Sequence, residues 1–272
     1  MIALIQAFVS LLLTVLYAID NDLTFALLDV FKILLFFVLI NIGLILLVLL
    51  FFVSFIYLTE KTSPKNKFKN FGFYHFNVYI FNFLFRVKPI FLGKENLPKD
   101  SNFVLYSNHV EYTDPLYILQ AYRKYSLAFI SKEELFKYPL IKNILRSTGG
   151  IPLSRKTGDR QALQAILQAI KQVKDGQPIA LFPEGTRNHG NTMKEFKSGS
   201  FRLPQKAKAD ISPVVLFNMH KTVDFFKVFR TKVYIKILPV IKYEEFKDMD
   251  TNTLSTYVHD IIFEELSTFK EQ

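Results

Sequence analysis

A histidine and an aspartate, His109 and Asp114, are separated by four residues in a segment where they could act together on a proton. The apolar run Phe103–Tyr106 before them predicts a short buried strand. Because Asp favours the N-cap and Pro the first turn, a helix capped by Asp114 is predicted over Pro115–Tyr122. A carboxylate on one imidazole nitrogen fixes the tautomer and leaves the other nitrogen as a base. This is the arrangement needed to deprotonate an alcohol.

Both residues also have ordinary structural explanations. Alone, Asp114 is typical of a helix cap and His109 of a hydrogen-bonded loop residue. Three further stretches carry glycine, arginine and other polar residues beside expected strand ends: Gly149–Arg155, Phe182–Arg187 and Ile211–Val215. Glycine permits close approach of a ligand to the backbone, and arginine offers a two-pronged donor for phosphate. The order and spacing of these stretches behind the His–Asp pair give that pair its significance.

From about residue 93 onward the pattern alternates between strands and helices. Strands are predicted at Phe103–Tyr106, Leu127–Ile130, Ile179–Phe182, Val214–Phe217 and Val233–Leu238, with Pro213 at the start of its strand. Amphipathic helices are predicted over Asp159–Lys174, capped by Asp159, and over Thr251–Phe269. In the first helix one face carries Leu163, Ile166, Leu167, Ile170 and Val173. The fold class that follows is α/β, with a mixed, mostly parallel sheet flanked by helices.

The first 60 residues differ sharply in composition from the rest. One basic and four acidic residues give them a charge of −3, so with +10 in total the remainder carries +13. Two apolar runs, Ile2–Ile19 and Ile33–Leu58, flank an acidic turn, and about 20 apolar residues suffice to cross a bilayer. The sequence therefore predicts a membrane-embedded helical hairpin. A cleaved signal peptide is less well supported, because the basic n-region and the small-residue cleavage site are missing.

Charge also predicts the orientation of this hairpin. Lysines 61, 65, 67 and 69 follow the second run, and short basic flanks stay in the cytoplasm. We therefore expect a cell-membrane protein with its globular part on the cytoplasmic face. Hydropathy leaves open whether the hairpin spans the bilayer or enters one leaflet. Three domains are predicted: a membrane segment at 1–60, a basic, aromatic linker helix at 61–92 and a catalytic domain at 93–272. The linker helix either lies on the membrane surface or packs as a core helix, and it leads into a strand at Val87–Leu92.

Four ordered blocks give the chain a close resemblance to a known family. They are Asn108-His109-x4-Asp114, Gly150–Arg155, Phe182–Arg187 and Ser212–Val215, and Phe-Pro-Glu-Gly-Thr-Arg is the most specific of them. Together they cover roughly residues 100–217. In these blocks the chain resembles the glycerolipid acyltransferases, specifically the 1-acylglycerol-3-phosphate (lysophosphatidic acid) acyltransferases. The resemblance implies acyl transfer from a thioester to the sn-2 hydroxyl of lysophosphatidic acid, forming phosphatidic acid in phospholipid biosynthesis.

The resemblance also implies roles for particular residues. His109 would be the general base and Asp114 would orient it. The implied substrate-binding residues are Asn108, Lys132, Arg155, Glu184, Gly185, Thr186 and Arg187. Of these, Arg155, Arg187 and Lys132 would hold the glycerol phosphate, and Glu184 would contact the glycerol headgroup or brace the basic cluster. Attack by the alcohol itself needs no nucleophilic side chain, which agrees with a chain that has no cysteine and no Gly-x-Ser-x-Gly elbow. No metal or organic cofactor is implied, and His189, His220 and His259 lack ligand spacing.

Other functions were weighed against this one. A basic, aromatic-rich chain could bind nucleic acid, but the apolar N-terminal runs and the lack of a glycine-aromatic RNA motif disfavour it. A non-catalytic membrane scaffold that binds anionic lipid is more plausible, and it would not need His109. Among enzymes, the alternative is acylation of another lysophospholipid, or a transacylase. The sequence leaves open whether the acyl donor is acyl carrier protein or coenzyme A, the acyl chain length, the oxyanion donors and the oligomeric state.

Overall fold

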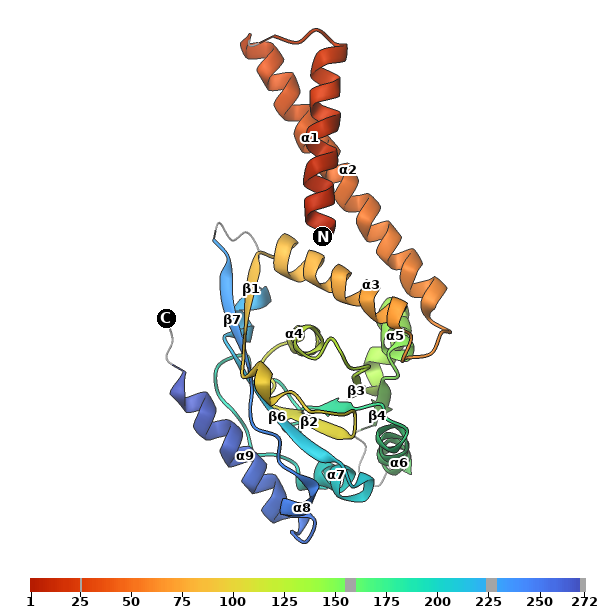
Figure 1. Cartoon of the computed structure of the whole chain (residues 1–272), viewed down its shortest axis with the longest axis vertical. Coiled ribbons are helices and arrows are strands. Elements are labelled where there is room, and N and C mark those ends of the chain that lie inside the picture. Colours follow the sequence, from red (N-terminus) through yellow and green to blue (C-terminus); the bar gives the residue numbers. More distant parts are fainter. Residues whose placement is uncertain (25, 155–159, 224–228, 270–272) are drawn as a thin grey trace. The chain divides into compact units, whose positions relative to one another are not determined.

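The computed structural model describes residues 1–24, 26–154, 160–223 and 229–269, which form two compact units (Figure 1). The first unit is Met1–Glu60 and the second is Lys61–Gln272.

The first unit is a pair of long apolar helices, α1 (Ile2–Asp20) and α2 (Leu27–Thr59). Both are long and apolar enough to cross a membrane, as the two apolar runs of the sequence predict. Tyr17 stacks on Phe36 with ring centroids 4.1 Å apart, and the Gln6 amide donates to Asn41 Oδ1 at 3.2 Å. A side-chain hydrogen bond such as that between Gln6 and Asn41 can hold apolar helices together in a bilayer, where no hydrophobic driving force acts between them.

A single sheet dominates the second unit. Its strands, within the described residues, are β1 (Val87–Leu92), β2 (Phe103–Ser107), β3 (Ala128–Lys132), β4 (Ile151–Leu153), β5 (Ile179–Leu181), β6 (Asp210–Phe217) and β7 (Thr231–Ile237). Their order is β1-β7-β6-β2-β5-β3-β4. Among these strands only the β6–β7 pair is antiparallel, so the sheet is mixed and mostly parallel, as predicted.

Helices cover both faces of this sheet (Figure 1). They are α3 (Lys67–Asn77), continued by the π-helix η1 (Val78–Leu84), α4 (Asp114–Ala121), α5 (Pro139–Ser147), α6 (Arg160–Lys174), α7 (Arg202–Ala207), α8 (Tyr243–Phe246) and α9 (Thr251–Thr268). Short 3₁₀ segments lie at Lys94–Asn96, Glu133–Lys137, Ser198–Phe201 and Met219–Val223.

The buried strand β2 shows why two layers of helices are needed. Its alternate residues Val104 and Tyr106 belong to a core cluster with α6, α7 and α9, whereas Phe103 and Leu105 belong to one with α4. Side chains of a strand point alternately to opposite faces, so a strand that is apolar throughout must be covered on both sides.

Helix α6 confirms the predicted helix, but only part of the predicted apolar face, Ile170 and Val173, packs on the core. The buried residues are Ala165, Ala169 and Val173, while Leu163 and Leu167 are 62% and 56% exposed. The face that packs on the core is therefore centred on the two alanines and Val173. The predicted cap, residue 159, lies outside the described residues.

Proline 213 does not open its strand as predicted but sits inside β6, paired with Tyr106 of β2. Its carbonyl accepts a hydrogen bond from the backbone N of Leu238, the residue that follows β7. The nitrogen and the carbonyl of a strand residue point to the same side, and the β6–β7 ladder starts only at Val214. The missing N–H of proline therefore faces Leu238 at the end of the β6–β7 pairing, so no bond between β6 and β2 is lost.

The segment before β1 packs in part as a core helix, one of the two predicted alternatives. Phe76 and Tyr79 are buried in the second unit, whereas Phe68 and Phe71 are 71% and 55% exposed. Lys69 is buried rather than solvated, and it donates to the carbonyls of Thr62 and Ser147. The strand Val87–Leu92 is confirmed. A location of this helix on the membrane surface stays a prediction.

Candidate active site

The predicted pair is formed at the carboxyl end of β2. His109 Nδ1 lies 2.8 Å from Asp114 Oδ2. Asp114 is fully buried, whereas the side chain of His109 is 18% exposed. The imidazole stacks on Phe182, with centroids 4.0 Å apart and planes 12° apart. With Nδ1 turned toward the carboxylate and the ring held flat on Phe182, Nε2 is the nitrogen that remains for a substrate.

Asp114 is not the helix cap that the sequence suggested. The N-cap of α4 is Thr113, and Asp114 is the first residue of the helix. Its Oδ2 instead accepts from the amides of Val110 and Glu111, at 2.6 and 2.9 Å, in the turn before the helix. Burial raises the pKa of Asp114, and the bonds from His109 and the two amides oppose that rise. The carboxylate thus braces the turn that carries His109 and does not cap the helix.

Glu184 connects the loop after β5 to this turn. Its Oε1 accepts from the backbone N of His109 at 2.7 Å, and its Oε2 accepts from Lys194 N at 2.8 Å and from the Asn188 amide. The backbone N of Asn188 in turn donates to His109 O at 2.9 Å. Glu184 is buried, and burial raises its pKa. In this structure the side chain braces the loops, and its predicted contact with substrate stays a prediction.

Gly185 is required by the backbone. It has φ +74°, and a Cβ there would lie 3.0 Å from Lys197 Nζ. Its amide donates to Phe182 O at 3.1 Å, closing a turn that contains Pro183. Since the left-handed region suits glycine, this residue allows the chain to turn sharply between Glu184 and the following basic residue.

Arg187 is held by two residues that motif reasoning missed. Its guanidinium lies over the ring of Tyr112, 3.3 Å from the centroid, and its Nη1 lies 3.5 Å from Glu111 Oε1. Both partners come from the four residues between His109 and Asp114. Charge is the one signal in the sequence that could have pointed to Glu111, an acidic residue that can pair with Arg187, and nothing in the pattern indicates Tyr112.

Asn108 acts as a link between strands. Its side chain is buried, donates to Leu216 O at 2.9 Å and accepts from Leu216 N at 2.8 Å. This pair of bonds fixes the end of β2 against β6, and so the position of His109. A direct substrate contact by Asn108 stays a prediction.

Two of the remaining predicted residues, Lys132 and Thr186, follow strands whose carboxyl ends lie at the same edge of the sheet as His109. Lys132 is exposed at the carboxyl end of β3, which runs parallel to β5 as β2 does. Carboxyl ends of parallel strands meet at one edge, where ligands of such sheets bind. Thr186 is exposed in the loop after β5. Arg155 lies outside the described residues.

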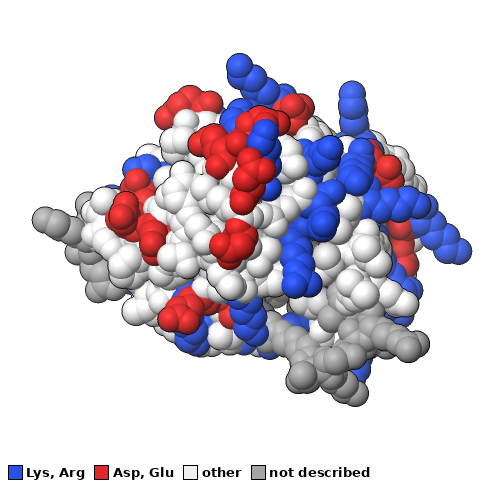
Figure 2. All heavy atoms as spheres, turned by 90° about the horizontal axis from the view of Figure 1, so that it is seen from below, with Lys and Arg blue, Asp and Glu red and all other residues white. Residues whose placement is uncertain are grey.

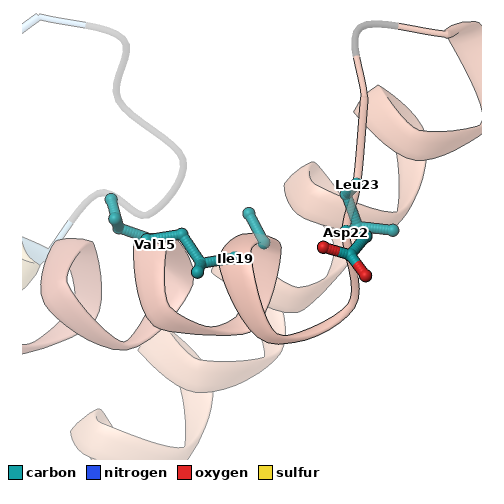
Figure 3. Close-up of a pocket in the computed structure, with 5 residues that line it drawn as sticks. Val15, Ile19, Asp22 and Leu23 are labelled. Carbon is teal, nitrogen blue, oxygen red and sulfur yellow. The ribbon is translucent and has the colours of Figure 1, made fainter.

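Metal-ligand groups and a depression on the hairpin were the other places where a functional site could lie. The described residues include no group of three or more histidine, cysteine, aspartate or glutamate side chains that could hold a metal ion. A depression of about 430 Å³ on the hairpin is lined by Val15, Ala18, Ile19, Asp22 and Leu23 (Figure 3). Its lining offers neither a base like His109 nor a cation for phosphate.

Comparison with known proteins agrees with this geometry. A family model described as Acyltransferase matches residues 88–217. The 1-acyl-sn-glycerol-3-phosphate acyltransferase of Borreliella burgdorferi is 32% identical over 186 residues, which cover 68% of this chain and 74% of that protein. The chain belongs to the 1-acyl-sn-glycerol-3-phosphate acyltransferase family. The family assignment made from the four sequence blocks is therefore confirmed.

Further matches define how far the likeness extends. The crystal structure of the 1-acyl-sn-glycerophosphate acyltransferase PlsC from Thermotoga maritima superposes with a TM-score of 0.64 at 26% identity. It covers 82% of this chain and 91% of that one, so the predicted fold is confirmed over most of the molecule. A relative from Chlamydomonas reinhardtii is 32% identical over 130 residues, but the match spans only 38% of that protein.

Proposed function

We propose that this chain transfers an acyl group from an acyl thioester to the sn-2 hydroxyl of 1-acylglycerol-3-phosphate, yielding phosphatidic acid. The observation that carries the proposal is the 2.8 Å contact between His109 Nδ1 and Asp114 Oδ2, in a chain of this family. The contact leaves Nε2 as the basic nitrogen, on a side chain that is 18% exposed.

The reaction needs one proton to move twice. His109 Nε2 takes the proton of the acceptor hydroxyl while the oxygen attacks the thioester carbonyl, and Asp114 stabilises the resulting imidazolium. The tetrahedral intermediate collapses, the C–S bond breaks, and the imidazolium returns the proton to the departing sulfur. The products are the ester and a free thiol. No side-chain nucleophile is required.

Arg187 and Lys132 are proposed to bind the phosphate of the acceptor. An arginine fork forms two charge-assisted hydrogen bonds with a phosphate, and a lysine adds a point charge. A monoester phosphate is smaller and more highly charged than one that carries a second ester, so this pair should favour lysophosphatidic acid over lysophosphatidylglycerol. Thr186 and Gly185 belong to the same loop and are proposed to border the acceptor.

The acyl donor is proposed to be an anionic thioester, either coenzyme A or an acyl carrier protein. The 61–272 segment carries a formal charge of +13, the balance of the chain's +10 after the −3 of the hairpin. Figure 2 shows lysine and arginine side chains gathered in a band along one face, with most acidic side chains of that view beside it. A basic surface attracts either donor, because both are negatively charged.

We further propose that the hairpin anchors the protein in the cell membrane with residues 61–272 on the cytoplasmic side. The support is the length of the two apolar helices and the lysines that follow the second. The lipid acceptor would then reach the site from the bilayer, and the donor from the cytoplasm.

The test is a direct assay of purified protein in lipid nanodiscs. Lysophosphatidic acid is supplied with either palmitoyl-coenzyme A or palmitoyl carrier protein, and both free thiol and phosphatidic acid are measured. Turnover should be higher on lysophosphatidic acid than on lysophosphatidylglycerol.

Arg187→Lys should raise KM for the acceptor because lysine keeps the charge but loses the two-pronged guanidinium. Arg202→Lys, at an exposed arginine of α7, is the matched control. Absence of phosphatidic acid with both donors would refute the proposed function.

A further inference from the structure

Between His109 and Asp114 the chain buries a carboxylate, Glu111, that the reaction above does not use. Its side chain is only 7% exposed. Glu111 Oε1 lies 3.5 Å from Arg187 Nη1, and its Oε2 lies 3.2 Å from His189 Nδ1. A buried carboxylate is costly unless it is paired, so a role for these contacts is expected.

Arg187 is fixed on two sides by this arrangement. The Tyr112 ring lies under the guanidinium at 3.3 Å, and the Tyr112 backbone N donates to Glu111 Oε1 at 2.9 Å. The side chain of Arg187 is 20% exposed. Among the described residues no second hydrogen-bond acceptor for this guanidinium is found, so its other N–H groups can serve a ligand.

The same glutamate is joined to the catalytic pair through its backbone. Glu111 N donates to Asp114 Oδ2 at 2.9 Å, the oxygen that also contacts His109. Moving Glu111 would therefore disturb both the arginine and the turn that presents the base. The backbone N of Asn188 donates to His109 O, and the backbone N of His189 donates to Val110 O. These two bonds join the loop after β5 to the turn before α4.

We propose that Glu111 is a positioning residue that holds Arg187 ready for the phosphate of the acyl acceptor, at a fixed place relative to His109. The proposal rests on the proposed function. A flexible arginine loses rotamer freedom when it binds a ligand, and a guanidinium ordered in advance avoids most of this cost. Glu111 and Tyr112 supply that order before the acceptor arrives.

An opposite effect has to be compared with this one. Glu111 is an anion, and near a bound phosphate it would repel it. Its charge is, however, already engaged by Arg187, by the Tyr112 amide and by the ring of His189. We therefore expect positioning to outweigh repulsion, so that loss of Glu111 weakens acceptor binding. If repulsion dominated, loss of Glu111 would tighten binding instead.

The experiment compares Glu111→Ala and Glu111→Gln, each alone and combined with Arg187→Ala, by steady-state kinetics in nanodiscs. Glu111→Ala should raise KM for lysophosphatidic acid by about two- to tenfold, the factor that corresponds to ordering one long side chain. Glu111→Gln keeps the Oε1 acceptor and should give a smaller rise. KM for the thioester should not change. Glu264→Ala, at an exposed glutamate of α9, is the matched control.

The double variant separates positioning from a general structural effect. If Glu111 acts through Arg187, adding Glu111→Ala to Arg187→Ala should raise KM no further. An additional, independent loss in the double variant, a lowered KM in either single variant, or a fall in kcat with unchanged KM would overturn the proposal. Thermal melting identifies unfolded variants, and Glu111→Gln carries the test if Glu111→Ala does not fold. If the wild type makes no phosphatidic acid, the proposed function is refuted. If Arg187→Ala leaves KM unchanged, the proposed phosphate contact of Arg187 is refuted. In either case the proposed role of Glu111 is refuted as well.

Discussion

The carboxylate of Asp114 concentrates its contacts on one oxygen. Oδ2 faces His109 and two backbone amides, while Oδ1 is buried with no hydrogen-bond partner among the described residues. This arrangement orients the imidazole from a rigid turn. Because the same oxygen accepts from Val110 N and Glu111 N, the conformation of the residues between His109 and Asp114 is coupled to the position of the His109 ring. The His-x4-Asp spacing alone does not indicate this coupling.

Replacement of the base gives the most direct prediction at this scale. His109→Ala should lower kcat by about 10²–10⁴-fold, the usual contribution of a general base, with little effect on melting temperature. Asp114→Asn should also be severely impaired, since an amide cannot stabilise an imidazolium. Thiol release measures both. The chain offers a control in a surface His–Asp pair, His259 and Asp260, whose ring nitrogen and carboxylate are 2.9 Å apart. His259→Ala should keep activity; near-full activity of His109→Ala would remove the assignment of the base.

Glu184 gives a prediction about stability. In Glu184→Gln an amide nitrogen would take the place of one carboxylate oxygen, and the donors at Oε2, Lys194 N and the Asn188 amide, would lose their acceptor. We expect a loss of about 1–3 kcal/mol in the free energy of unfolding, the cost of unsatisfied buried donors. Urea unfolding of this variant and of Glu195→Gln, an exposed neighbour, measures the difference. Equal stability of the two variants would show that Glu184 is not a brace.

At the scale of elements, Lys69 fastens α3 to the end of α5. Its ammonium donates to Ser147 O, in the last turn of α5, and to Thr62 O before α3. A cation at a helix C-terminus complements the unpaired carbonyls there. The aromatic segment before β1 is thereby joined to the rest of the second unit by more than apolar packing.

The buried position of Lys69 makes a pH prediction possible. Burial lowers its pKa from 10.5 to about 8, so the folded state favours the neutral amine more than the unfolded state does. A depressed folded pKa contributes stability that is present above the unfolded value and lost as pH falls through the folded one. The melting temperature of wild type relative to Lys69→Met should therefore rise between about pH 8 and 10.5. Lys67→Met, at an exposed lysine of the same helix, should show no such trend. A wild-type advantage that shrinks over this range would show that the hydrogen bonds to the charged form dominate.

At the scale of the whole molecule, the proposal of a membrane hairpin can be tested by cysteine labelling, because the chain has no cysteine of its own. Ala3→Cys and Lys99→Cys should both react only from the cytoplasmic side. Asn21→Cys, in the turn between α1 and α2, should react from outside if the hairpin spans the bilayer. It should be protected from outside if the hairpin enters one leaflet. Labelling of Ala3→Cys from outside alone would exclude the hairpin in the proposed orientation.

The sequence determined the features that depend on local pattern. Apolar runs predicted the two N-terminal helices and the strand before His109, since burial and periodicity are properties of short segments. The spacing of His109 and Asp114 brought them together, because a strand-to-helix turn is a local structure. The order of the four blocks was sufficient to identify the family.

Tertiary structure decided what depends on partners distant in the chain. Glu184 turned out to brace His109 across 75 positions, and Asn108 to bond Leu216 across 108. Helix α6 buries Ala165 and Ala169 and leaves Leu163 and Leu167 exposed, because the rotation of a helix about its axis is decided by what it packs against. Proline 213 fits inside β6 because its nitrogen faces the end of the β6–β7 pairing and not the β2 ladder. Glu111 and Tyr112 meet Arg187 only after β2 and β5 pair side by side, so no local pattern could have predicted how Arg187, the proposed phosphate ligand, is held.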